Sequence, residues 1–558
     1  MSKMRKSAKL LLALITCWTL AACSGNTGTS SNGSAANSNA NLAEADASQP
    51  KPSPDEPAWK LDTSPITFDW YVNFDWFTSK WGGNVVSDYI TKKTGVSINF
   101  IAPTGNASDR LSTMMAAKSL PDFITLGTDD DAVQKVIKGD MVLPLNKLAD
   151  QYDPYFFKVA DPMKVSWYTQ ADSNVYGYPN ASSSPVDYQK YGQDMTSNQV
   201  FVVRKDMYEA LGKPDMSTPE GFLAALKAAK KKFPEVNGQP LIPIGLHDFN
   251  DTGNFSLGPY LQNFLAIPQQ KSGKLYDRQS DPTYLKWLKV FRQANEDGLM
   301  QTDVFIDKRP QINEKIAQGR YFAMLYQSSD FAEANQALYQ KDPNKVYIAI
   351  DGPADDVHDT PTLAGNRVSG WTLTLISKNV RDKKRAIAFL SYLISEEGNK
   401  DLCLGEKGVT YDTIDGKDQF LPEVMHLLNT DRKAFDSKDG GSYKYWMLMD
   451  TNMWLKWKPA DIEPAKQLAD WTRGKTISMS EFDDLDPSPT TKEGIAKAKN
   501  DQLWSQTLPK LLMSKSDAEF DQLFTEYMNS LTDRKAIEAS RQAAYERNVQ
   551  KLKLPVNQ

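Results

Sequence analysis

The chain has few of the residues that most often bind transition metals or form disulfides. Its 558 residues include three cysteines and three histidines. Cys17 and Cys23 lie in an N-terminal export segment described below, so Cys403 alone remains and an intramolecular disulfide is excluded. The histidines are far apart in sequence and lack neighbouring ligand patterns: His247, His358 and His426. A zinc site or a histidine-based triad is poorly supported, and we predict no metal, no cofactor and no catalytic residue.

The chain also lacks a surplus of positive charge and, after its N-terminus, any long apolar run. The formal net charge is −5, which argues against binding to nucleic acid, whose phosphates require a basic face. No later run is long and apolar enough to predict a transmembrane helix. With 40% hydrophobic and 24% charged residues, the composition is that of a soluble globular protein.

The N-terminus has the pattern of an export signal. Its first nine residues include four basic side chains and no acidic one, and residues 10–20 are apolar apart from two threonines. This apolar run is shorter than the roughly 20 residues of a membrane-spanning helix. It ends in Leu20-Ala21-Ala22-Cys23, which resembles the lipobox of bacterial lipoproteins. We predict a signal peptide over residues 1–22 and palmitate-type acylation of Cys23. An ordinary signal peptide with a chance cysteine is the alternative.

A tether is predicted to follow, over residues 23–60. Ser, Gly, Asn, Ala and Thr dominate it up to residue 49, and four prolines lie between Pro50 and Pro57. Such a segment has too little apolar surface to offset the entropy lost on ordering. It would hold a globular body away from a bilayer. We therefore expect a cell-membrane protein that is lipid-anchored on the extracytoplasmic face.

The remaining chain alternates between strand-like and helix-like segments. About 500 residues exceed what one core usually holds, so two or more lobes are expected. Strands are predicted at 66–72, 96–101, 123–126, 200–203, 242–246, 321–326, 346–350 and 371–376. Helices are predicted at 84–94, 108–117, 205–211, 218–232, 284–296 and 381–395, with a mostly helical part after residue 441. This order predicts an α/β fold with mainly parallel sheets.

Several short motifs, taken in order, resemble those of the extracellular solute-binding lipoproteins of carbohydrate ABC importers, of the large Gram-positive type. They are Ser119-Leu120-Pro121-Asp122, Val175-Tyr176-Gly177-Tyr178-Pro179, Val203-Arg204-Lys205-Asp206-Met207, Thr218-Pro219-Glu220-Gly221-Phe222, Glu296-Asp297-Gly298-Leu299, Gly319-Arg320-Tyr321-Phe322-Ala323-Met324 and Gly405-Glu406-Lys407-Gly408-Val409-Thr410-Tyr411. None is specific alone, but together they cover most of the mature chain in the family's order.

The resemblance implies a two-lobe fold of the type II periplasmic-binding-protein kind, with a helical C-terminal part. It implies that residues 61–197 and 365–412 form one lobe, and that residues 198–364 and 413–558 form the other. It further implies a monomeric binding protein, not an enzyme. Such a protein captures an oligosaccharide between its lobes by hinge closure and delivers it to ABC permease subunits.

One loop departs from the family pattern. Many relatives carry a calcium loop after the second-lobe helix, but residues 234–243 here offer one carboxylate, Glu235, and have Pro240-Leu241 where an Asp-Glu pair is expected. Ca²⁺ usually requires six to eight oxygen ligands and several carboxylates. We predict no calcium ion there.

Candidate sugar-binding residues were chosen by position, because most aromatic residues in any protein are core. Sugars present apolar faces to aromatic rings and hydroxyls to amides and carboxylates, and ligands of α/β sheets lie beyond the carboxyl ends of strands. The predicted contacts are Asn73, Asp75, Trp76, Trp81, Thr128, Asp129, Gln199, Tyr326, Gln327, Trp371, Tyr411, Trp446 and Trp454. Trp70 and Trp287 are assigned to the core.

Two other function classes stay open at this point. A lipid-anchored glycoside hydrolase would need two carboxylates facing each other across the scissile bond. Asp75 and Asp129 are the available pair, but nothing in the sequence places them together. A peptide-binding protein of the same fold is the other alternative, whereas the scarcity of His and Cys argues against transition-metal cargo.

Overall fold

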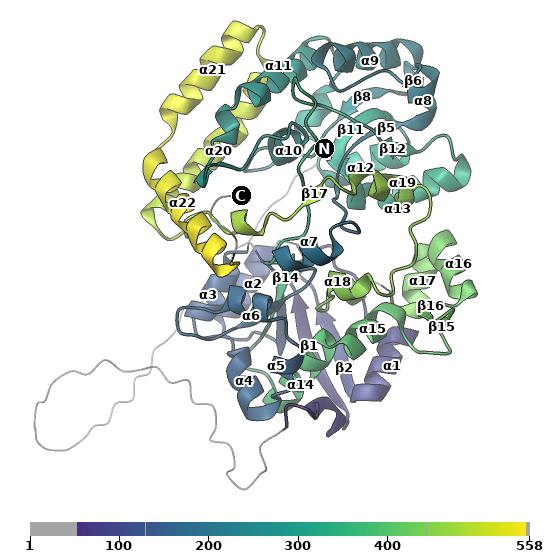
Figure 1. The fold of residues 1–558 in the computed structure, drawn as a ribbon, viewed down its shortest axis with the longest axis vertical. Coiled ribbons are helices and arrows are strands. Elements are labelled where there is room, and N and C mark those ends of the chain that lie inside the picture. Colours follow the sequence, from purple (N-terminus) through teal and green to yellow (C-terminus); the bar gives the residue numbers. More distant parts are fainter. Residues whose placement is uncertain (1–52, 106, 129, 442, 554–558) are drawn as a thin grey trace, which may run out of the picture. The chain divides into compact units, whose positions relative to one another are not determined.

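The computed structural model describes residues 53–553 except residues 106, 129 and 442. The predicted signal peptide, Cys23 and residues 23–52 of the predicted tether lie outside the described residues. The end of the predicted tether is folded instead, because Ala58 and Trp59 are buried in a short helix at 58–60. Residues 51–558 form one compact unit by their contacts, and the description below concerns that unit. Within it two separate sheets, each with its own helices, confirm the predicted two-lobe α/β fold (Figure 1).

The first lobe is built on a five-stranded sheet with the order β2-β1-β3-β14-β4. Its strands are β1 (Ile66–Val72), β2 (Val96–Ile101), β3 (Phe123–Gly127), β4 (Gly177–Pro179) and β14 (Thr372–Ile376). β1 pairs in parallel with β2 and β3, whereas β14 is antiparallel to both β3 and β4. All strands except β14 therefore run in the same direction, as a mainly parallel sheet requires.

The second lobe repeats this arrangement with the order β12-β5-β11-β8. Its strands are β5 (Gln199–Arg204), β8 (Ile242–Gly245), β11 (Tyr321–Gln327) and β12 (Tyr347–Ala349). β5 is antiparallel to both neighbours, and β11 pairs in parallel with β8. The reversed strand in each sheet, β5 or β14, is the one that directly follows a crossing between lobes.

Helices surround both sheets. Those in and next to the first lobe are η1 (Ala58–Lys60), α1 (Val85–Thr94), α2 (Ala107–Ala116), α3 (Ala132–Lys138), α4 (Leu145–Tyr152), α5 (Phe156–Val159), α6 (Pro162–Tyr168), α7 (Pro185–Tyr191), α14 (Lys383–Ile394), α15 (Glu396–Leu404), α16 (Pro422–Thr430), α17 (Arg432–Asp439), η5 (Tyr443–Tyr445) and α18 (Thr451–Trp454). A hairpin of β15 (Tyr411–Ile414) and β16 (Lys417–Phe420) joins them.

The second lobe has the remaining helices and several two-residue strands. Its helices are α8 (Lys205–Ala210), α9 (Pro219–Lys232), η2 (Ser256–Tyr260), α10 (Leu261–Phe264), η3 (Arg278–Ser280), α11 (Pro282–Glu296), η4 (Thr302–Phe305), α12 (Arg309–Ala317), α13 (Ser328–Lys341), α19 (Ala465–Thr472), η6 (Ser480–Phe482), α20 (Lys492–Met513), α21 (Asp517–Ser530) and α22 (Arg534–Lys551). The short strands are β6 (Glu235–Val236), β7 (Gln239–Pro240), β9 (Gln270–Lys271), β10 (Lys274–Leu275), β13 (Leu363–Ala364) and β17 (Thr476–Ile477).

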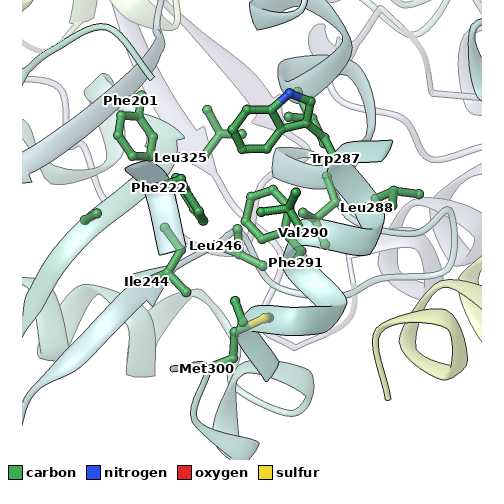
Figure 2. Packing of buried hydrophobic residues seen from close by; sticks show 14 of the residues in the cluster. Phe201, Phe222, Ile244, Leu246, Trp287, Leu288, Val290, Phe291, Met300 and Leu325 are labelled. Atoms are coloured by element: carbon green, nitrogen blue, oxygen red, sulfur yellow. The ribbon is translucent and has the colours of Figure 1, made fainter. Parts of the chain in front are cut away.

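Each sheet has its own core. Trp70 of β1 is fully buried and stacks on Phe123, as predicted for a core residue. Trp287 on α11 is also buried, as predicted, and contacts Phe222 in the core of the second lobe (Figure 2). The core of the second lobe also includes Leu508 of α20 and Phe520 of α21. The C-terminal helices are therefore packed into the second lobe rather than appended to it.

Three chain segments lie side by side where the lobes join. Ser197 Oγ donates to the Ala364 carbonyl at 2.6 Å, and β13 pairs in parallel with β17. These contacts bring the segments around Asn198 and Gly365, where the first two crossings are expected, next to each other. The β15–β16 hairpin and α16–α18 contact first-lobe elements, whereas α19 contacts β12 and β5. These contacts favour a third crossing between Trp457 and Ala465, not near Asp412.

The predicted strands and long helices agree with the structure to within a few residues. α9 begins at Pro219 after the Thr218 cap, as its sequence signal indicates. The short helices α3–α7 and the β15–β16 hairpin were not predicted. After Gly441 the chain has short helices and irregular segments until α20, so the mostly helical part begins 50 residues later than expected.

At the predicted calcium-free loop, residues 235–240 form the tight hairpin β6–β7, with Asn237 and Gly238 at positive φ. Among the described residues, no three His, Cys, Asp or Glu side chains gather in a way that could hold a metal ion. Nor does any helix of the described chain have both the length and the hydropathy that a membrane crossing needs.

Candidate functional site

Five aromatic side chains gather at the carboxyl end of β1 and the start of β14. They form what we call the aromatic surface: Phe74, Trp76, Phe77, Trp371 and Trp446. The Trp76 and Trp371 rings lie 6.3 Å apart and 18° from parallel, and Trp446 contacts both rings, at 4.9 and 5.4 Å. Trp76 is 53% exposed and Trp371 40% exposed, although both contact other rings.

The backbone around Trp371 is held firmly. Its amide donates to the Asn180 carbonyl at 3.2 Å, and its carbonyl accepts from the Thr128 amide at 3.1 Å. Gly370 precedes it at a φ of +74°, where a Cβ would lie 2.2 Å from the Asn180 carbonyl oxygen. A side chain at position 370 would therefore displace the turn that presents Trp371.

A contact between α1 and Tyr443 positions Trp446 in the aromatic surface. Asn84 caps that helix and donates from Nδ2 to the Tyr443 hydroxyl at 2.7 Å, three residues before Trp446. Trp81 packs 5.0 Å from the Tyr443 ring, and its Nε1 donates to Thr91 Oγ1 at 2.8 Å. The structure thus places Trp81 beneath the aromatic surface, where it supports Tyr443.

The predicted polar residues beside the aromatic surface have different surroundings. Asn73 is buried: its Oδ1 accepts from the Tyr71 hydroxyl and its Nδ2 donates to Asp130. Asp75 is exposed and adjoins Trp76 in the same loop. Thr128 is half-buried and holds Trp371 through its backbone. Asp129 lies outside the described residues.

A cavity of about 1010 Å³ lies on the second lobe, next to the crossing segments. Its walls come from residues 196–199, 255–263, 274–279 and 364–367 and from one side of α20, α21 and α22. Polar and charged side chains line it together with Tyr260, Tyr276 and Tyr527. Aromatic and amide groups in one concave site are the combination that a polyhydroxylated ligand needs.

Two predicted residues line this cavity. Gln199 Oε1 accepts from Asn263 Nδ2 at 3.0 Å and from the Ala364 amide at 3.2 Å, which ties the second sheet to a crossing segment. Gln327 Oε1 accepts from the Tyr260 hydroxyl at 2.8 Å, and its Nε2 donates to Ser329 and Asp330. Both amides are positioned by fixed neighbours.

The cavity and the aromatic surface are joined by one short segment. Arg367 lines the cavity, and its carbonyl accepts a hydrogen bond from the Gly370 amide. Trp371 of the aromatic surface is the residue after Gly370. Four residues span at most about 14 Å, so a ligand of a few sugar units could reach from one surface to the other.

The other predicted contacts lie elsewhere. Tyr326 is fully buried and stacks on His247 with the rings 4.2 Å apart. Tyr411 is buried in a separate cluster with Phe420 and Phe435, against which Trp454 packs. None of these three lines the cavity or belongs to the aromatic surface, and we leave them out of the proposed site.

His247 is buried below the cavity wall. Burial, followed by the positive charge of Arg309, lowers the pKa of its imidazole to about 4. Its ring also contacts Tyr260, and desolvation raises the pKa of that phenol above its usual range. His247 is therefore neutral at physiological pH and serves as a packing residue.

Several residues of these surfaces were not predicted. Phe74 and Phe77 lie in the same loop as Trp76, and their sequence position could have identified them. Arg278, Tyr260 and the residues of α20–α22 had no such signal, because only the packing of the C-terminal helices closes the cavity around them.

Several solved structures of binding proteins have the same fold. The alginate-binding protein AlgQ2, solved without calcium ion, shares 19% identity and a TM-score of 0.63, covering 88% of this chain and 100% of its own. The Streptococcus pneumoniae substrate-binding protein FusA, an EF-hand mutant with fructo-nystose, has 15% identity and a TM-score of 0.64, covering 86% and 99%. An extracellular solute-binding protein from Bifidobacterium longum subsp. infantis has 18% identity and a TM-score of 0.61, covering 87% and 98%.

A sequence relative with a lipoprotein name is also found. Lipoprotein LipO of Bacillus subtilis (strain 168) is 23% identical over 339 residues, which are 59% of this chain and 64% of that protein. The family profile of the bacterial extracellular solute-binding proteins matches residues 86–410, more than half of the chain. The chain belongs to the family of bacterial extracellular solute-binding proteins.

Proposed function

We propose that this protein is the substrate-binding component of an ABC importer that captures an oligosaccharide and delivers it to a membrane permease. The observation that carries the proposal is the aromatic surface beside a polar cavity. Trp76 and Trp371 expose ring faces on which the C–H faces of a sugar can stack, and the cavity supplies Gln199 and Gln327 for hydroxyls.

The ligand would act as a bridge. The aromatic surface belongs to the first lobe and the cavity to the second, and both adjoin the segments 197–199 and 363–367. A ligand that touches both surfaces binds the closed arrangement of the lobes more tightly than the open one. It would thereby shift the population toward the closed form, which the permease could then recognise.

Acylation of Cys23 would keep the protein on the extracytoplasmic face of the cell membrane, with the segment between Cys23 and η1 as a tether, and it would work as a monomer without catalytic activity. No observation on the described residues favours a hydrolase, because Asp75 is exposed with no second carboxylate placed opposite it.

Calorimetry tests the proposal. The purified full-length chain is titrated with a panel of neutral and acidic oligosaccharides of two to six units. We expect saturable binding of at least one of them. That binding should be weakened in Trp371→Ala and retained in Trp454→Ala, which removes a tryptophan outside the site. Failure of every sugar in the panel to bind would contradict the proposal.

A further inference from the structure

Arg278 differs from the other buried arginines of the described chain. Arg204, Arg292 and Arg385 are at most 5% exposed, and a guanidinium nitrogen of each lies within 3.1 Å of a carboxylate oxygen. Arg278 is 8% exposed, and no ion pair with a carboxylate is found for it among the described residues. A buried charge without a counter-charge is costly, so such groups are usually paired.

The hydrogen bonds of the Arg278 side chain are incomplete. One Nη donates to Asn263 Oδ1 at 2.7 Å, and its buried Nε has no acceptor in the described part of the chain. Asp281 is the nearby acid, but its carboxylate already accepts from the Tyr276 hydroxyl and from the Thr283 amide. The guanidinium therefore keeps donors that its neighbours do not satisfy.

The Arg278 side chain lines the cavity, so a ligand bound there could accept hydrogen bonds from its unsatisfied donors. Seven basic and three acidic side chains line it, so positive charge prevails there although the chain as a whole is acidic. Other lining cations are already paired: Arg367 with Asp483, Arg534 with Asp277 and Lys497 with Asp501. Arg278 is the buried cation of the lining that is left for a ligand.

We propose that the cavity takes an oligosaccharide carrying an anionic group, and that Arg278 binds this group. The inference rests on the proposed function and narrows its substrate class. A carboxylate of a uronic acid or a sulfate ester supplies the required chemistry, since both accept paired hydrogen bonds from a guanidinium. Burial in a site of low dielectric strengthens such a contact.

The test compares three ligands of equal length on the full-length chain: a uronic-acid oligosaccharide, a sulfated oligosaccharide and a neutral oligosaccharide. We expect an anionic ligand to bind at least tenfold tighter than the neutral one, and the carboxylate and sulfate arms identify the group. Arg278→Gln should remove this preference and Arg278→Lys should keep part of it. Arg110→Gln, which removes an exposed cation remote from the cavity, should leave it unchanged.

A second variant protects the test against misfolding of Arg278→Gln. Asn263→Asp would place a carboxylate beside the Arg278 guanidinium, giving it an internal counter-charge. We expect this variant to remain folded by circular dichroism and to lose at least tenfold in affinity for the anionic ligand.

Equal or tighter binding of the neutral oligosaccharide by the wild-type chain would overturn the inference and leave the proposed function standing. An anion preference that persists in both Arg278→Gln and Asn263→Asp would also overturn it. If none of the three ligands and none of the wider panel binds, the proposed function itself fails.

Discussion

The two surfaces that adjoin the crossing segments differ in chemistry. The aromatic surface of the first lobe is formed by rings that contact one another, and two of its tryptophans are 40% or more exposed. The cavity of the second lobe is lined by amides, tyrosines and charges, many of which already have partners. In the proposed function, stacking and polar recognition are therefore divided between the lobes, and neither surface alone would account for binding.

The largest effect on binding is expected when the aromatic surface is removed. The double variant Trp76→Ala/Trp371→Ala should lose about 1,000-fold in oligosaccharide affinity, because each tryptophan anchor contributes about 2 kcal/mol. Its free energy of unfolding should fall by less than about 2 kcal/mol, since both side chains are only partly buried. Calorimetry and urea denaturation measure the two effects.

Trp454→Ala is the matched control for that variant. Trp454 packs against the Tyr411 cluster and lies beneath Lys444, whose Nζ is 3.9 Å from the ring centroid. We expect its affinity to change by less than about twofold while stability decreases. A large loss of affinity in this variant would show that the site was misplaced.

Acid should decrease the stability of the second lobe, because it protonates the buried His247. Its pKa of about 4 in the folded chain lies below the ordinary value of 6.5, so the unfolded chain binds the proton first. The stability that comes from the neutral ring is fully present above pH 6.5 and is lost as the pH falls toward 4, by up to about 3 kcal/mol.

Urea denaturation at pH 7.5 and pH 4.5 measures this loss, with His247→Gln as the comparison. The variant should show a smaller decrease in the free energy of unfolding between the two pH values. An equal decrease in both proteins would assign the pH dependence to other groups.

A smaller effect is expected on the cavity side. Gln199→Ala should weaken oligosaccharide binding by about tenfold, because the amide both lines the cavity and fixes Asn263 and the Ala364 amide. Gln318→Ala removes an exposed amide that bonds to Glu314 of α12 and does not line the cavity, and it should leave affinity unchanged. Equal affinities for the two variants would show that the cavity is not part of the binding site.

Sequence patterns predicted the regular elements well where local signals were strong. β1 (Ile66–Val72) and β2 (Val96–Ile101) match their predicted bounds, and α9 has a cap and a first-turn proline that fix its start. The helices between β3 and β4 have only four to eight residues each, and helices this short depend on tertiary contacts that no local pattern shows.

The candidate site was predictable only in part. Trp76 and Trp371 could be found because each adjoins a strand end at the cleft-facing edge of its sheet. Arg278 could not, because its proposed role depends on a buried guanidinium that has no ion pair among the described residues, and the packing of the whole lobe decides this. Tyr326 was predicted from its place at the carboxyl end of β11, but its side chain lies in the core against His247.

The account depends most on one ligand joining both surfaces. Small-angle X-ray scattering of the full-length chain, with and without a saturating concentration of the tightest-binding oligosaccharide, tests this directly. We expect the radius of gyration to decrease on binding, and to decrease less in Trp371→Ala at equal occupancy. An unchanged radius of gyration at full occupancy would contradict the account.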